Sequence, residues 1–118
     1  MALLLCLGLL MVPALPANGA EVLQVRSSTL LQIGDRNRSY SVRLGCRRDS
    51  DPDPDAALAW LRGQLPRGTR VNLLPLDNDQ GTLVARVRRL DDGLDLSVGL
   101  AQAGLIEWDD ACGAPPCP

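Results

Sequence analysis

The most constraining stretch of this chain is Gly68–Trp108, in which two alternating segments, a polar turn and a short helix follow one another. Apolar and polar residues alternate over Arg70–Leu76 and again over Thr82–Leu90, which predicts two strands because successive strand side chains point to opposite faces. The polar residues Asp77–Gly81 end in glycine and predict the turn between them. Asp95 is placed to cap a short helix. This stretch therefore predicts a hairpin with one buried face.

Three further strands and a longer helix are expected before this stretch. Alternating or apolar runs predict strands over Glu21–Val25, Thr29–Ile33 and Ser39–Leu44, with the turn Gly34–Asn37 between the last two. Asp53 as cap, a proline in the first turn and a leucine stripe predict a helix that ends before Pro66, over Pro54–Leu65.

The resulting order, β-β-β-α-β-β-α, is that of a five-stranded Greek-key barrel of the OB-fold type. The expected fold class is therefore mainly β with two short helices. Residues 21–108 form the expected domain, and residues 109–118 form a Pro- and Cys-containing tail. Pro75 lies inside a predicted strand, which indicates an edge or a bulge there because proline has no backbone N–H.

The first 20 residues are typical of an export signal. Ala2–Val12 is almost wholly apolar, as long as a secretory hydrophobic core and too short to span a bilayer. We expect cleavage after Ala17 or Ala20 and a monomer in the periplasm, in a lumen or outside the cell, with no stable membrane span. A retained anchor is the alternative. No Lys or Arg precedes Arg26, so we expect either a start further upstream or the α-amino group to supply the positive charge of a signal.

Cysteines and composition exclude several classes of site. Cys46, Cys112 and Cys117 follow the leader, so at most one disulfide forms among them; we favour Cys46 paired with one of the other two over a Cys112–Cys117 loop. The chain has no His, which removes Ser–His and Cys–His nucleophiles and the common zinc sites. Its aromatic residues are too few for a base-stacking platform.

Charge is uneven along the chain. The net charge is −2, and all 12 basic residues are arginine. Residues 21–50 carry a net charge of +3 and residues 51–118 a net charge of −5. Non-specific binding of nucleic acid requires a strong positive field, so only a local basic patch could supply it here.

Several motifs carry a family resemblance in order and at the right spacing. Val42–Leu44 is similar to a "vRL" strand, Gly68–Val71 and Gly81–Val87 are similar to "G..V" and "yGR.lA.v" strands, and Leu96–Ile106 is similar to an "L…G.A" closing helix. From about Glu21 to Trp108 the chain resembles the staphylococcal nuclease-like (thermonuclease-like, SNase) domain. This resemblance implies the same five-stranded OB barrel.

The resemblance also implies where a catalytic site would lie. Family members that cleave nucleic acid use a calcium ion held by acidic residues, a carboxylate that activates water and two arginines on the phosphate. Carried over singly, one metal acid falls at Ser28 and another at Arg48. The first arginine is kept as Arg43 and the second arginine falls at Thr82. The catalytic glutamate falls near Asp51, with Asp53 as the other candidate if the loop shifts.

We therefore expect a catalytically impaired nuclease homologue, with Arg43 and Asp51 as remnants and no metal or other cofactor. Groups that act as one unit lose most of their rate together. The alternative is an active nuclease whose atypical metal site, again for calcium, would be built from Asp49, Asp51 and Asp53.

The expected ligand is nucleic acid or a protein partner. A solvated face paired with Asp-rich loops is the alternative interpretation of both basic clusters. The candidate nucleic-acid contacts form two clusters, one of Arg43, Arg47 and Arg48, and one of Arg86, Arg88 and Arg89.

Overall fold

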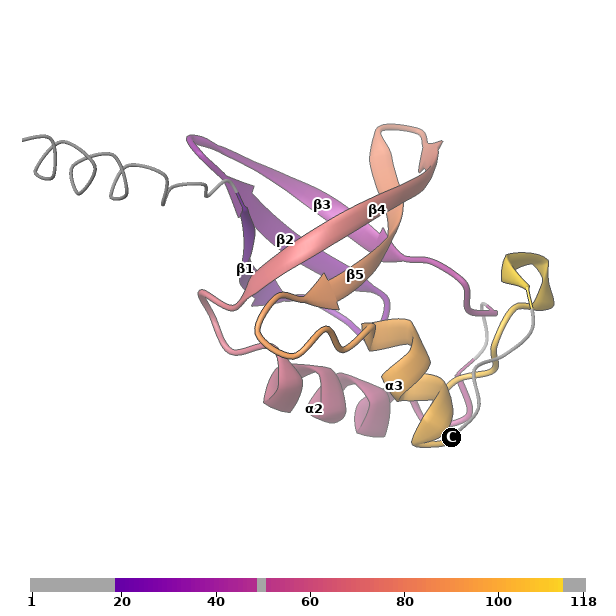
Figure 1. Cartoon of the computed structure of the whole chain (residues 1–118). Helices are drawn as coiled ribbons and strands as arrows, with labels where there is room; N and C mark the ends of the chain where they lie inside the picture. Colours follow the sequence, from indigo (N-terminus) through magenta and orange to yellow (C-terminus); the bar gives the residue numbers. More distant parts are fainter. Residues whose placement is uncertain (1–18, 49–50, 114–118) are drawn as a thin grey trace, which may run out of the picture.

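The computed structural model describes residues 19–48 and 51–113 (Figure 1). Helices and strands follow one another in the predicted order. They are β1 (Ala20–Val25), β2 (Leu30–Asp35), β3 (Arg38–Leu44), α2 (Pro54–Gln64), β4 (Arg70–Asp79), β5 (Thr82–Arg89), α3 (Leu96–Gln102) and the 3-10 turn η2 (Asp110–Cys112).

The strands form a closed barrel in the order β1-β2-β3-β5-β4. Neighbouring strands are antiparallel except β3 and β5, which run parallel through Val42↔Leu83, Arg43↔Val84 and Leu44↔Ala85. Closure leaves less of the sheet edge unpaired than an open sheet would, although β1 covers β4 only at Arg70 and Val71. The expected class, a mainly β, OB-fold-like barrel with two short helices, is confirmed.

The β4–β5 hairpin is longer than the sequence predicts. β4 continues to Asp79, and the loop is only Gln80–Gly81, both with positive φ (54° and 92°). Two such residues form the tight turn that matches the twist of a hairpin. The Gly81 N–H also donates to Asn78 Oδ1 at 3.0 Å. The expected five-residue turn is therefore wrong in length, whereas the register shift after Pro75 confirms the bulge.

The turn between β2 and β3 is also shorter than predicted. Arg36 and Asn37 form it, and Arg36 has a φ of 63°. Gly34 lies inside β2, where an added Cβ would be 3.1 Å from the Leu23 side chain. Close packing, and not the turn, is therefore what requires glycine at this position.

Both helices begin where the sequence places their caps. Asp53 Oδ1 accepts from the Ala56 N–H at 3.1 Å, and Asp95 Oδ1 accepts from the Ser97 and Val98 N–H groups at 3.0 and 3.1 Å. These carboxylates satisfy N–H groups that lack partners inside the helix.

α2 and α3 pack together at one end of the barrel, and the tip of the β4–β5 hairpin projects at the other (Figure 1). Leu61 of α2 and Leu96 and Leu100 of α3 are fully buried. Trp60 packs against this core, and an added Cβ on Gly99 would lie 2.6 Å from its ring. The two helices thus close the barrel because a small residue lets them approach.

A disulfide joins the exit of β3 to the C-terminal segment. Cys46 is bonded to Cys112, and the sequence separation of the two residues is 66. The structure describes the chain past Trp108 as far as Gly113, and Cys117 lies outside the described residues. The predicted signal, residues 1–20, likewise falls almost wholly outside them. Within the described part of the chain, no helix is long and apolar enough to cross a membrane.

Replacing Cys112 with Ser should lower the free energy of unfolding by about 2–4 kcal/mol, because the unfolded chain regains the entropy of a long open loop. Urea unfolding with and without reductant measures this. Reductant should bring the wild type to the stability of the variant and leave the variant unchanged. An equal effect of reductant on both proteins would contradict a stabilising Cys46–Cys112 bond.

Candidate functional site

Two of the positions that the resemblance assigns to catalysis, Ser28 and Asp51, meet in a buried cluster that Arg47 completes. The Asp51 carboxylate accepts from Arg47 Nη2 through one oxygen and from Ser28 Oγ, at 2.7 Å, through the other. Arg47 Nη1 also donates to the Ser28 carbonyl at 2.7 Å. Both oxygens of the carboxylate are therefore already bonded within the protein.

Local backbone geometry brings these three residues together. Ser27 Oγ accepts from the Thr29 and Leu30 N–H groups, which holds the β1–β2 connection with Ser28 inside it. At the end of β3, the Gly45 carbonyl accepts from the buried Ser97 Oγ at 2.7 Å. Cys46 follows with a φ of 63°, and the next residue forms a β-bridge with Trp108.

Burial decides what this cluster can do chemically. The Arg47 and Asp51 side chains are only 3% and 5% exposed. A carboxylate enclosed with a guanidinium is already neutralised, so it does not offer a free site to a cation or to a water proton. This corrects the expectation that Arg47 is a surface contact, and it leaves Asp51 closed as a catalytic base.

Arg43, the arginine that the resemblance retains, is paired on the outer surface. Its Nη1 donates to Asp79 Oδ2 at 2.8 Å, with both side chains about half exposed. Asp79 lies opposite Thr82 in the hairpin register. The position where the resemblance expects the second arginine is thus beside an acid that binds the first.

Most of the other predicted arginine contacts are paired as well. Arg86 donates to Asp95 at 2.8 Å and lies 5.5 Å from the Trp108 ring centre. Arg48 lies 3.9 Å from Glu107, and both side chains are exposed. The Arg88 side chain has no hydrogen bond or ion pair to the described residues. The two basic clusters are therefore largely neutralised at the surface.

Arg89 belongs to a capped turn. It bonds to Asp92, and it also donates to the Gln64 carbonyl at 3.1 Å and to the Gln64 side chain. The hydrogen bond from Arg89 is the main reason that the pKa of Asp92 falls to about 2. Arg89 therefore ties the β5–α3 turn to α2, and its predicted role in binding has no geometric support.

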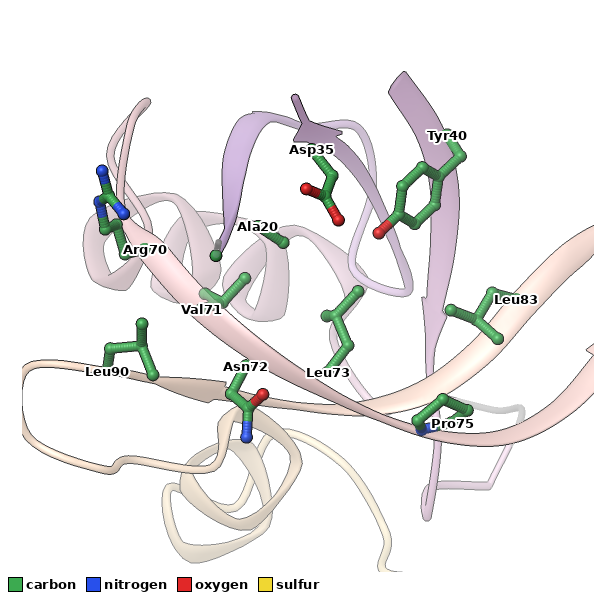
Figure 2. Close-up of a pocket in the computed structure, with 11 residues that line it drawn as sticks. Ala20, Asp35, Tyr40, Arg70, Val71, Asn72, Leu73, Pro75, Leu83 and Leu90 are labelled. Atoms are coloured by element: carbon green, nitrogen blue, oxygen red, sulfur yellow. The ribbon is translucent and has the colours of Figure 1, made fainter. Parts of the chain in front are cut away.

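A second candidate site, which the sequence did not indicate, is a groove between the start of β1, the ends of β2 and β3 that meet at their turn, and one edge of β4. We call it the Tyr40 groove. It has a volume of about 720 Å³, and Figure 2 shows the Tyr40 ring and the Asp35 carboxylate facing the β4 side chains across it. Its apolar lining consists mainly of Ala20, Tyr40, Val71, Leu73, Pro75 and Leu83.

Two smaller hollows continue the Tyr40 groove around the β2–β3 turn. They share Asp35, Tyr40 and Leu83 with it, and they add Arg36 and Arg38. Arg70 lines the groove at its β4 side. Tyr40 looks like an ordinary inward-facing residue in the alternating pattern of its strand, so a signal for the groove is missing from the sequence.

The Tyr40 hydroxyl has a raised pKa. Partial burial is the main cause, the Asp35 carboxylate raises the pKa further, and the Arg38 guanidinium opposes this. The surroundings of Tyr40 thus disfavour the negative charge that its hydroxyl would carry after losing its proton.

Neither the described side chains nor the comparisons with known proteins add a metal centre or a relative to this description. Within residues 19–48 and 51–113, no three His, Cys, Asp or Glu side chains are grouped as a metal site requires. Asp49 of the alternative calcium site lies outside the described residues. No protein-family model matches the chain, and no curated protein matches its sequence.

Breaking the buried pair should be costly. Arg47→Met should lower the free energy of unfolding by about 3–5 kcal/mol, because it leaves the Asp51 carboxylate buried and uncompensated. Adding Asp51→Leu should recover most of the loss. Urea unfolding measures the cycle, and Arg48→Met, an exposed neighbour, should change stability by less than about 1 kcal/mol. A small effect of Arg47→Met would contradict the pair.

Tyr40 is the only tyrosine, so its ionisation can be followed by absorbance. Asp35→Asn should lower its pKa and Arg38→Gln should raise it, whereas Asp55→Asn on α2 should leave it unchanged. Because the folded-state pKa lies above the unfolded value of 10.0, folding stability should fall as the pH rises past 10.0. A Tyr40 pKa that is insensitive to Asp35→Asn would contradict this electrostatic contact.

Proposed function

We propose that this protein is a nuclease-like OB barrel that binds a protein partner and hydrolyses no phosphodiester bonds. The observation that carries the proposal is the buried cluster of Ser28, Arg47 and Asp51. Its guanidinium satisfies the carboxylate that the resemblance would make the general base. Hydrolysis also needs a second positive group on the phosphate, and Thr82 stands at that position.

Charge favours a protein over nucleic acid as the ligand. A binder of the phosphate backbone needs several unpaired cations on one face. Of the arginines predicted to contact nucleic acid, Arg43 and Arg86 are paired to carboxylates and Arg47 is buried, so the predicted clusters do not supply such a face. The net charge of −2 supplies no attractive long-range field for a polyanion.

Surface shape agrees with a binding role. The Tyr40 groove combines apolar side chains with a few polar groups at its rim, which is the usual composition of a recognition site. The groove and the position that the resemblance assigns to catalysis lie at different ends of β3. The buried cluster follows the C-terminal end of that strand, and Tyr40 lies near its start.

Hydrolysis of a fluorogenic single-stranded DNA by the purified full chain tests the proposal. We expect no cleavage above background, equal in calcium and in chelator, because Asp51 is closed by Arg47. A commercial calcium-dependent nuclease serves as positive control for the substrate. Calcium-dependent cleavage that Asp51→Asn abolishes would overturn the proposal and favour the alternative, an active nuclease with an atypical metal site.

A further inference from the structure

The barrel seam between β1 and β4 is short. β1 pairs with β4 only at Ala20↔Val71 and Glu21↔Arg70, whereas β4 continues to Asp79. The β4 edge beyond Val71 therefore borders the Tyr40 groove and, in the part of the chain that the structure describes, carries no paired strand.

Hydrogen bonds around the seam show which backbone groups face that edge. The Thr69 carbonyl accepts from the Val22 N–H on the β1 side, and the Arg70 carbonyl accepts from the Leu90 N–H on the β5 side. Backbone groups alternate between the two sides along an antiparallel strand. The Val71 and Leu73 N–H and carbonyl groups therefore face β1, and those of Leu73 lie past the last described pair.

The floor of the groove suits an apolar side chain. Tyr40, Leu73 and Leu83 are partly buried around it, and Figure 2 shows them converging on the same space. A strand added along β4 would place alternate side chains into this space, since strand side chains alternate between faces.

Unpaired positive charge surrounds the same groove. Among the described residues, five arginines have no side-chain hydrogen bond or ion pair, and three of them lie along the groove and its continuation. These three outnumber the single acid there, Asp35, on a protein whose net charge is −2. The five are Arg26, Arg36, Arg38, Arg70 and Arg88.

We propose that the Tyr40 groove binds an extended acidic peptide segment of a partner protein, which adds as a strand to the free edge of β4. Backbone pairing at Leu73 would supply affinity, an apolar residue would fill the space beside Tyr40, and acidic residues would contact Arg38 and Arg70. This inference rests on the proposed binding function. A peptide fits better than nucleic acid because only a peptide backbone offers donors and acceptors at strand spacing.

Fluorescence anisotropy of a labelled peptide, EEVVVEE, with the full chain tests the proposal. Arg38→Glu and Arg70→Glu should each weaken binding at least tenfold, whereas Arg26→Glu, an exposed and unpaired arginine away from the groove, should change it less than twofold. A peptide with Lys in place of every Glu should not bind. Binding that all three reversals weaken equally would overturn the assignment to this groove.

N-methylation of the peptide tests strand addition itself. Methyl groups on alternate backbone amides of one parity should abolish binding, and those of the other parity should leave it unchanged, because only one edge of an added strand faces β4. Equal tolerance of both patterns would overturn strand addition. Absence of binding to the full chain would overturn the proposal entirely, including the case in which the chain's own residues before Gly19 cover the edge.

A labelled dT oligonucleotide in the same buffer with calcium separates this proposal from the function on which it rests. Cleavage of the oligonucleotide would refute the non-hydrolytic function. An uncut oligonucleotide together with no peptide binding would refute only the groove assignment. Binding of the oligonucleotide that Arg70→Glu abolishes would show that the groove binds polyanions. That result would overturn the proposal of a peptide ligand.

Discussion

The short parallel pairing of β3 with β5 is the contact on which both candidate sites depend. It covers only Val42–Leu44 against Leu83–Ala85, yet it closes the barrel. Before this pairing, the start of β3 is free of β5, and the Tyr40 groove opens there. After it, the chain enters the buried turn at Gly45 and carries Arg47 into the interior.

Neutralisation of arginine decides the chemistry of this surface. A guanidinium stays charged at any ordinary pH, so its role depends on whether a carboxylate lies beside it. Arg47 is enclosed with Asp51, and Arg43 and Arg86 are matched by acids from other elements. Arg38 and Arg70 are left without such partners at the groove, which separates the proposed recognition site from the position that the resemblance assigns to catalysis.

Local signals predicted most of the fold. The Asp53 and Asp95 caps, the bulge after Pro75 and the strand alternation depend on neighbours in sequence, so they could be read without the structure. The turns were predicted too long, because pairing extends a strand wherever its partner continues, as β4 does to Asp79. Of the candidate site, the sequence supplied the positions Ser28 and Asp51 but not the guanidinium that joins them.

By itself, the sequence determined the order of strands and helices, the absence of histidine chemistry and the presence of Thr82 where the resemblance expects an arginine. Tertiary structure alone decided which of the arginines stay free. Arg47 and Arg48 are adjacent and identical in type, yet one is buried and the other is exposed. Their difference arises because burial depends on segments far away in the chain, here those of Ser28 and Trp108 beside Arg47, and no local pattern records those contacts.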